Sequence, residues 1–98
     1  MERLFAALRS RGPGWDHSKP LEGQADWSAH AAFMDALFAQ RVVALAGPLE
    51  DTREALIILR AASVSEVVER LAPDPWTTSG LLTTRQISVW QLRLGSLD

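Results

Sequence analysis

The sequence predicts an α+β fold of the ferredoxin-like type, βαββαβ, in which a four-stranded antiparallel sheet carries two helices on one face. The first observation is the order of the apolar segments, which indicate strand, helix, strand, strand, helix and strand in turn. The second is that two of these segments have the periodicity of amphipathic helices. The third is that the two middle strands are continuous apolar runs, which is typical of strands buried on both faces.

Composition limits the kind of protein. The 98 residues fit one domain, residues 1–98, and apolar residues make up 47% of them. The net charge is −2 and the basic residues form no stripe, so nucleic acid is not an expected partner. Cysteine is absent, which excludes disulfides and thiolate catalysis. Neither a signal peptide nor an apolar stretch of about 20 residues is present, so a cytoplasmic protein without membrane attachment is expected.

The first strand is predicted at residues 4–8, a short apolar run before the turn-rich segment 10–14. Residues 10–23 contain three glycines and two prolines, which predict a long irregular connection. A loop of this length in a small domain is more often functional than not.

The first helix is predicted at residues 24–40, where the apolar positions share one broad face. That face contains Trp27, His30, Ala31, Phe33, Met34, Leu37 and Phe38. No glycine follows at Gln40 or Arg41, so the sequence does not define the end of the helix.

Two strands are predicted next, at residues 42–46 and 55–59, joined by a polar turn at 50–53. The second helix begins at Ser63, with Glu66 three residues later as a capping box, and prolines at 73 and 75 end it. Residues 74–80 are expected to form a loop. The last strand is predicted at residues 81–94, with a bulge near Val89 and Trp90, because the alternation of apolar residues changes phase there.

Two helices shield only one face of the predicted sheet. The middle strands and the last strand leave apolar side chains on the other face, which is more than monomers usually expose. A homodimer, or an oligomer built from dimers that pair sheet to sheet, is therefore expected.

Metal and nucleotide sites have little support. The two histidines, His17 and His30, lack paired carboxylates at ligand spacing, and no glycine-rich phosphate loop follows a strand. We therefore expect no metal and no cofactor.

His30 is the most informative residue, because an imidazole on an apolar helix face either bonds the backbone at the core edge or acts as a general acid or base. The second role requires a partner that fixes the tautomer, usually a carboxylate. Asp74 is the preferred partner, since prolines on both sides restrict its backbone, although a turn aspartate is the simpler interpretation. Asp35 points to the polar side of the helix. Asp26, one turn before His30, remains an alternative carboxylate partner for it.

Aromatic residues suggest a binding pocket. Trp15 and Trp76 are in predicted loops, where a large apolar side chain is buried only if the loop covers a pocket or its ligand. Trp27 and Met34 flank His30 on the helix, so they are expected to contact a small organic molecule together with Trp76.

Three motifs occur in an order that resembles the YciI-like, or YCII-related, family. They are residues 27–35 (WSAHAAFMD), residues 46–49 (AGPL), and the segment that starts with Asp74-Pro75-Trp76 and continues through Ser79-Gly80-Leu81. Each motif is short, but as an ordered set they extend over nearly the whole chain. Arg41 departs from the family pattern, which often has a glycine near the end of this helix.

The resemblance implies the dimeric α+β barrel superfamily and a histidine–aspartate dyad that matches His30 and Asp74. It also implies that Ser79 and Gly80 form part of the pocket rim. Relatives in that superfamily include cofactor-free isomerases, dehydrochlorinases and monooxygenases that act on small cyclic or aromatic compounds. The favoured hypothesis is thus a small-molecule enzyme that transfers protons, of the lyase, isomerase or dehydrochlorinase kind. The alternative is a non-catalytic module of the same fold that binds a small ligand or assembles with other proteins.

Overall fold

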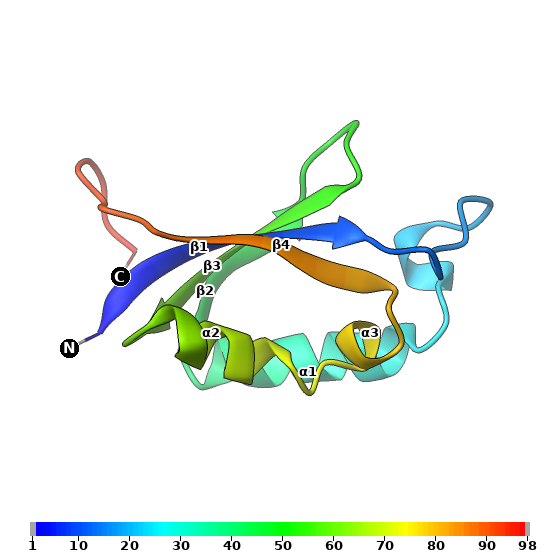
Figure 1. Cartoon of the computed structure of the whole chain (residues 1–98), viewed down its shortest axis with the longest axis horizontal. Helices are drawn as coiled ribbons and strands as arrows, with labels where there is room; N and C mark the ends of the chain where they lie inside the picture. The colour runs from blue at the N-terminus through cyan, green and yellow to red at the C-terminus, as the bar shows by residue number, and fades with distance from the viewer. Residues whose placement is uncertain (1, 98) are drawn as a thin grey trace.

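The computed structural model describes residues 2–97 and has the predicted α+β order. Its elements are β1 (Arg3–Arg11), the 3-10 helix η1 (Leu21–Gly23), α1 (Trp27–Ala39), β2 (Val43–Pro48), β3 (Glu54–Ala61), α2 (Val64–Leu71), α3 (Pro75–Thr78) and β4 (Leu82–Val89). The four strands form one antiparallel sheet in the order β2-β3-β1-β4. The three α-helices all lie on one face of this sheet (Figure 1), which confirms the predicted fold class.

The main core lies between the sheet and helices α1 and α2. On the two central strands, Phe5 is opposite Leu59 and Ala7 is opposite Ile57, and all four side chains are buried. Helix α1 adds Leu37, and helix α2 adds Val67 and Leu71. Every second residue of β1 therefore faces the helices, as the pleat of a strand requires.

Helix α1 begins at Trp27, three residues later than predicted, because Asp26 adopts a left-handed conformation with φ of 61°. It ends at Ala39 and is followed by Arg41 in the left-handed region, with φ of 63°. The N–H of Val42 then bonds the carbonyl of Leu37 at 2.9 Å. This is the geometry that glycine favours after a helix, and it explains why a glycine is expected at the position of Arg41.

Helix α2 has the predicted start. The Ser63 hydroxyl accepts a hydrogen bond from the N–H of Glu66 at 3.2 Å, so serine is the N-cap. The Glu66 carboxylate accepts from the N–H of Ala62 at 3.4 Å rather than from that of Ser63. The Glu66 side chain thus bonds the N–H of the residue before the N-cap, instead of the N–H of the N-cap residue that a capping box uses.

Three predictions about residues 74–94 are wrong. Residues 75–78 form a one-turn helix, α3, rather than a loop, because Asp74 caps it and Pro75 occupies its first position. The last strand ends at Val89 rather than at Leu94. Its irregularity lies at Arg85, where the pairing with β1 shifts by one residue, and not near Val89 and Trp90.

The connection after the first strand is also shorter than predicted. Strand β1 extends to Arg11, because the polar residues 9–11 continue the pairing with β3 and β4. Tight turns and η1 occupy much of the remaining segment up to residue 23.

The second face of the sheet has no helix over it in the described chain (Figure 1). Leu8 of β1 pairs with Leu56 of β3, and Leu45 of β2 pairs with Ile58 of β3, which places all four on this face. None of these side chains belongs to the helix-covered core, and Leu45 is 53% exposed. We call this surface, with Leu4 and Ala6, the open sheet face.

Candidate functional site

His30 on α1 and Asp74 at the start of α3 lie in direct contact. The His30 Nδ1 atom is 2.8 Å from Asp74 Oδ1 and 3.0 Å from Oδ2. The histidine side chain is 12% exposed and the aspartate side chain is fully buried. No hydrogen bond or ion pair joins His30 to the side chains of Asp26 or Asp35 in the described structure, so Asp74 is its carboxylate neighbour.

Asp74 accepts hydrogen bonds from three directions. Besides His30, the N–H of Trp76 donates to Oδ1 at 3.0 Å and the Arg9 guanidinium donates to Oδ2 at 2.8 Å. Burial by itself raises the pKa of Asp74, but the bonds from His30, Trp76 and Arg9 together hold that pKa below its ordinary value. The carboxylate is therefore ionised at neutral pH.

Arg9 reaches the site from the sheet. It follows Phe5 and Ala7 on the helix-facing side of β1 and is completely buried. One terminal nitrogen bonds Asp74 and the other donates to the Thr77 hydroxyl, which in turn donates to the carbonyl of Leu71 at 3.0 Å. The sequence prediction missed Arg9 because it ended the strand at residue 8. The signal that identifies it is the alternation at residues 5, 7 and 9.

The contacts of His30 fix the roles of its two ring nitrogens. An ionised carboxylate only accepts hydrogen bonds, so the Nδ1 atom next to Asp74 carries a hydrogen. In the neutral ring, Nε2 then keeps its lone pair and can accept a proton. Arg9 balances the charge of Asp74, so the buried group is an ion pair with an imidazole attached rather than an isolated anion.

Tryptophan side chains surround the imidazole. The rings of His30 and Trp76 are stacked, with centroids 3.8 Å apart and planes 6° apart. Trp27 lies 6.0 Å from His30, and Trp15 meets Trp76 edge to face at 5.4 Å. Trp76 is held in turn by its Nε1–H, which donates to the carbonyl of Ala25 at 2.6 Å. The plane of the imidazole is thus fixed by both packing and hydrogen bonding.

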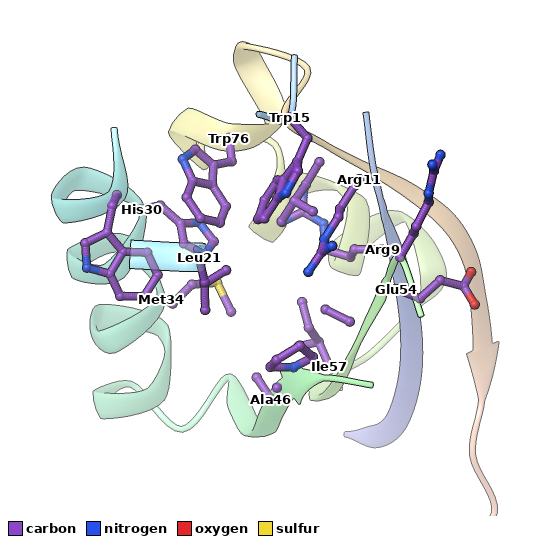
Figure 2. Close-up of a pocket in the computed structure, with 16 residues that line it drawn as sticks. Arg9, Arg11, Trp15, Leu21, His30, Met34, Ala46, Glu54, Ile57 and Trp76 are labelled. Carbon is purple, nitrogen blue, oxygen red and sulfur yellow. The ribbon is translucent and has the colours of Figure 1, made fainter. Parts of the chain in front are cut away.

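A cavity of about 240 Å³ lies beside this cluster, between the N-terminal part of α1 and strands β1 to β3 (Figure 2). Its wall consists of Arg9, Arg11, Trp15, Leu21, Trp27, His30, Met34, Ala46, Gly47, Pro48, Arg53, Glu54, Ala55, Ile57, Trp76 and Leu82. The wall includes four of the residues that the sequence indicated as site residues, namely Trp27, His30, Met34 and Trp76. Asp74 lies behind His30 rather than in the wall.

Ser79 and Gly80 are not among the described residues that line the cavity. They form the turn between α3 and β4, where Gly80 has φ of 78° and its carbonyl oxygen packs against Gly12. A Cβ atom at Gly12 would lie 1.9 Å from that oxygen. Contact of these two residues with a ligand stays a prediction, while their position gives them a role in joining two chain segments.

The far wall of the cavity is polar, a feature that the sequence pattern does not indicate. The guanidinium of Arg11 lies 4.5 Å from the ring centroid of Trp15. The backbone N–H of Arg11 bonds the carbonyl of Arg53, so these two arginines approach each other only when β1 and β3 pair. Glu54 is bound to Arg85 at 2.5 Å, and Figure 2 shows its carboxylate directed away from the cavity.

Two features are absent from the described residues, 2–97. No group of three or more histidine, cysteine, aspartate and glutamate side chains there has an arrangement that could hold a metal ion. No helix in the same residues has the length and apolar character needed to cross a membrane.

Comparison with known proteins gives one family match and one similar solved structure. The sequence model of the YCII-related domain matches residues 15–91. Among solved structures, the chain is similar to the 5-chloro-2-hydroxyhydroquinone dehydrochlorinase of Burkholderia phenoliruptrix AC1100, in complex with 2,5-dihydroxybenzoquinone. The TM-score is 0.63 and the identity is 26%, over 94% of this chain and 95% of the other. A search of curated proteins found no match.

Proposed function

The chain belongs to the YCII-related domain family, and we propose that it is a small-molecule enzyme in which His30 transfers a proton on a small cyclic or aromatic compound. The observation that carries this proposal is the hydrogen bond of 2.8 Å between His30 Nδ1 and the buried Asp74. It leaves Nε2 of a cavity-lining imidazole as the free proton acceptor.

In the proposed reaction, Nε2 of His30 removes a proton from the bound compound. The imidazolium that forms is stabilised by the Asp74 carboxylate, which also keeps the ring in the reactive orientation. In an elimination, the electron pair of the broken bond stays in the substrate and expels a leaving group such as chloride. In an isomerisation, His30 returns the proton to another atom of the same molecule. Neither route requires a cofactor, because no electrons leave the substrate.

The similar dehydrochlorinase supports the elimination route, because its name describes the loss of hydrogen chloride from a hydroxylated ring and its structure contains a quinone. The tryptophan-lined cavity also supports a flat ring as substrate, since offset or edge-to-face contacts with aromatic side chains favour such a shape. A volume of about 240 Å³ has room for a substituted six-membered ring.

Replacement of the histidine tests the proposal. Turnover of a panel of chlorinated hydroquinones and small lactones is followed for the wild type and for His30→Gln. We expect kcat to fall by about 10²- to 10⁴-fold in His30→Gln, because the proton acceptor is lost. His17→Gln is the matched control, since His17 is exposed and outside the cavity wall. Equal kcat values for His30→Gln and the wild type would contradict the proposal.

The same variants separate catalysis from the alternative, a non-catalytic binding module. If the module only binds ligand, His30→Gln stays folded and no member of the panel is turned over by the wild type. If His30 only stabilises the fold, His30→Gln lowers the melting temperature instead. Circular dichroism of each variant is therefore measured beside turnover.

We also propose that two copies of the chain pair through the open sheet face. The support is the row of apolar side chains on that face, including Leu8, Leu45 and Leu56, which a second sheet of the same composition would cover. A second copy fits because a two-fold axis brings identical apolar patches together.

A further inference from the structure

The polar wall of the cavity has a positive charge that proton transfer by His30 does not use. Among the described residues, three arginines line the cavity, namely Arg9, Arg11 and Arg53, and Glu54 is the one carboxylate in the wall. With Asp74 behind His30, and with Arg85 bound to Glu54, four guanidinium groups accompany two carboxylates, so the described part of the site has two positive charges in excess.

Both of these carboxylates already have cationic partners. Asp74 is bound to Arg9, and Glu54 is bound to Arg85 on β4, outside the cavity wall. Neither Arg11 nor Arg53 forms a salt bridge with a carboxylate in residues 2–97. The excess charge therefore belongs to Arg11 and Arg53, at the β1–β3 side of the cavity.

Arg9 adds a second, independent observation. Its side chain is completely buried and its two terminal nitrogens bond Asp74 and Thr77, but its Nε–H has no hydrogen-bond partner among the described residues. Buried donors in folded proteins nearly always have an acceptor, because an unpaired one is costly. Arg9 belongs to the cavity wall, so an oxygen atom of a bound molecule can supply that acceptor once the side chains that cover the Nε atom move aside.

The Arg11 guanidinium is positioned to contribute to the same site. It lies over the Trp15 ring at 4.5 Å, and Figure 2 shows the side chain extending from β1 into the cavity. A guanidinium held by an aromatic ring loses little further freedom when it binds, and its planar array of N–H groups matches the two oxygens of a carboxylate.

We infer that the cavity binds a ring compound that bears a carboxylate, held by the Nε–H of Arg9 and the guanidinium of Arg11, with the ring against the tryptophans and the reacting atom at His30. The negative charge of such a compound neutralises one of the two excess positive charges of the wall. This inference rests on the proposed function in taking the cavity as the substrate site, and it adds the substrate class.

Benzoate and benzamide are suitable probes, because they have nearly the same shape and differ in charge. Calorimetric titration measures their affinity for the wild type, for Arg11→Gln and for the control Arg70→Gln. Arg70 lies on the exposed surface of α2, so its replacement makes the same change in net charge away from the cavity. Proton–nitrogen correlation spectra of each titration follow the Arg9 Nε–H signal.

We expect the wild type and Arg70→Gln to bind benzoate roughly tenfold or more tightly than benzamide, and Arg11→Gln to lose that preference. The Arg9 Nε–H signal shifts with benzoate and much less with benzamide. Equal affinities for the two probes, no effect of Arg11→Gln, or no binding of either probe at millimolar concentration would overturn the inference.

The His30→Gln variant separates this inference from the proposed function. If benzoate binds His30→Gln as tightly as the wild type and no substrate is turned over by either protein, the carboxylate site stands and proton transfer is refuted. If turnover depends on His30 but benzoate and benzamide bind equally, proton transfer stands and the carboxylate site is refuted.

Discussion

At the scale of single residues, the chemistry of the site depends on how Asp74 is held. Its carboxylate joins three elements, because Arg9 comes from β1, His30 from α1, and Asp74 itself caps α3. A carboxylate bound in this way cannot turn without breaking bonds to a buried cation and to a backbone N–H. The orientation of the imidazole therefore follows from the fold rather than from local sequence.

This arrangement predicts how stability depends on pH. The pKa of Asp74 is lower in the folded protein than the value of about 3.9 in an unfolded chain, so the carboxylate stabilises the fold at every pH above that value. The contribution is lost as the pH falls from about 4 through the folded pKa. Asp74→Asn removes this acid-dependent component and lowers the free energy of unfolding at pH 7 by about 3–5 kcal/mol, because Arg9 loses its partner.

Urea unfolding of the wild type and Asp74→Asn between pH 7 and pH 2.5 measures both effects. Asp35→Asn is the control, since Asp35 is exposed on the outer side of α1. If the free energies of unfolding of the wild type and of Asp74→Asn changed equally with pH over this range, Asp74 would not be the stabilising carboxylate.

Local sequence predicts part of the cavity wall and misses the rest for a definite reason. The sequence indicates His30, Trp27 and Met34 because they share one face of a periodic helix, and Trp76 because it is an aromatic residue in a predicted loop. Arg9 and Arg11 were missed because a strand is read from apolar residues, and a charged residue ends the run. Their contribution depends on the pairing of β1 with β3 and β4, which one strand alone does not reveal.

At the scale of elements, the order and type of the strands and of both longer helices were predictable, because each has a clear apolar pattern or cap. Helix α3 was not predictable from periodicity, since four residues make only one turn. The bulge at Arg85 was misplaced for a related reason. It interrupts the polar segment 83–86, where no apolar alternation marks the change of phase.

The junction of β1 with β4 gives a prediction at this scale. The N–H of Gly12 bonds the carbonyl of Leu81 at 2.8 Å, and the backbone of Gly80 lies against the Cα atom of Gly12. Gly12→Ala places a methyl group 1.9 Å from the Gly80 oxygen, so the two segments must separate. We expect a loss of about 1–3 kcal/mol in the free energy of unfolding.

Thermal unfolding of Gly12→Ala beside Gly47→Ala tests this contact. A Cβ atom at Gly47 has no atom within 4 Å, so that substitution leaves the packing unchanged. For a domain of this size, 1 kcal/mol corresponds to a shift of roughly 4–8 °C in Tm. Equal Tm values for the two variants would contradict this prediction, because they would show that the backbone at Gly12 shifts without a loss of stability.

At the scale of the whole molecule, the two faces of the sheet differ in what covers them. The helix-covered face holds the core, and toward the start of α1 and α3 it opens into the cavity with His30. The open sheet face has no charged residue near its centre, where Ala6 and Leu8 of β1 lie beside Ile58 and Leu56 of β3. Pairing through that face would leave the cavity on the opposite side of each sheet.

Two exposed apolar residues distinguish pairing through the open sheet face from simple surface hydrophobicity. Leu45 on that face is 53% exposed in the single chain, and Val68 on the outer side of α2 is 52% exposed. If two sheets pack together, Leu45→Lys buries a charge in the interface and dissociates the pair, whereas Val68→Lys leaves it intact. Light scattering at micromolar concentration should give about twice the chain mass of 10.8 kDa for the wild type and for Val68→Lys, and a lower mass for Leu45→Lys. A wild type of single-chain mass would refute the pairing, and an equal effect of both substitutions would place the interface elsewhere.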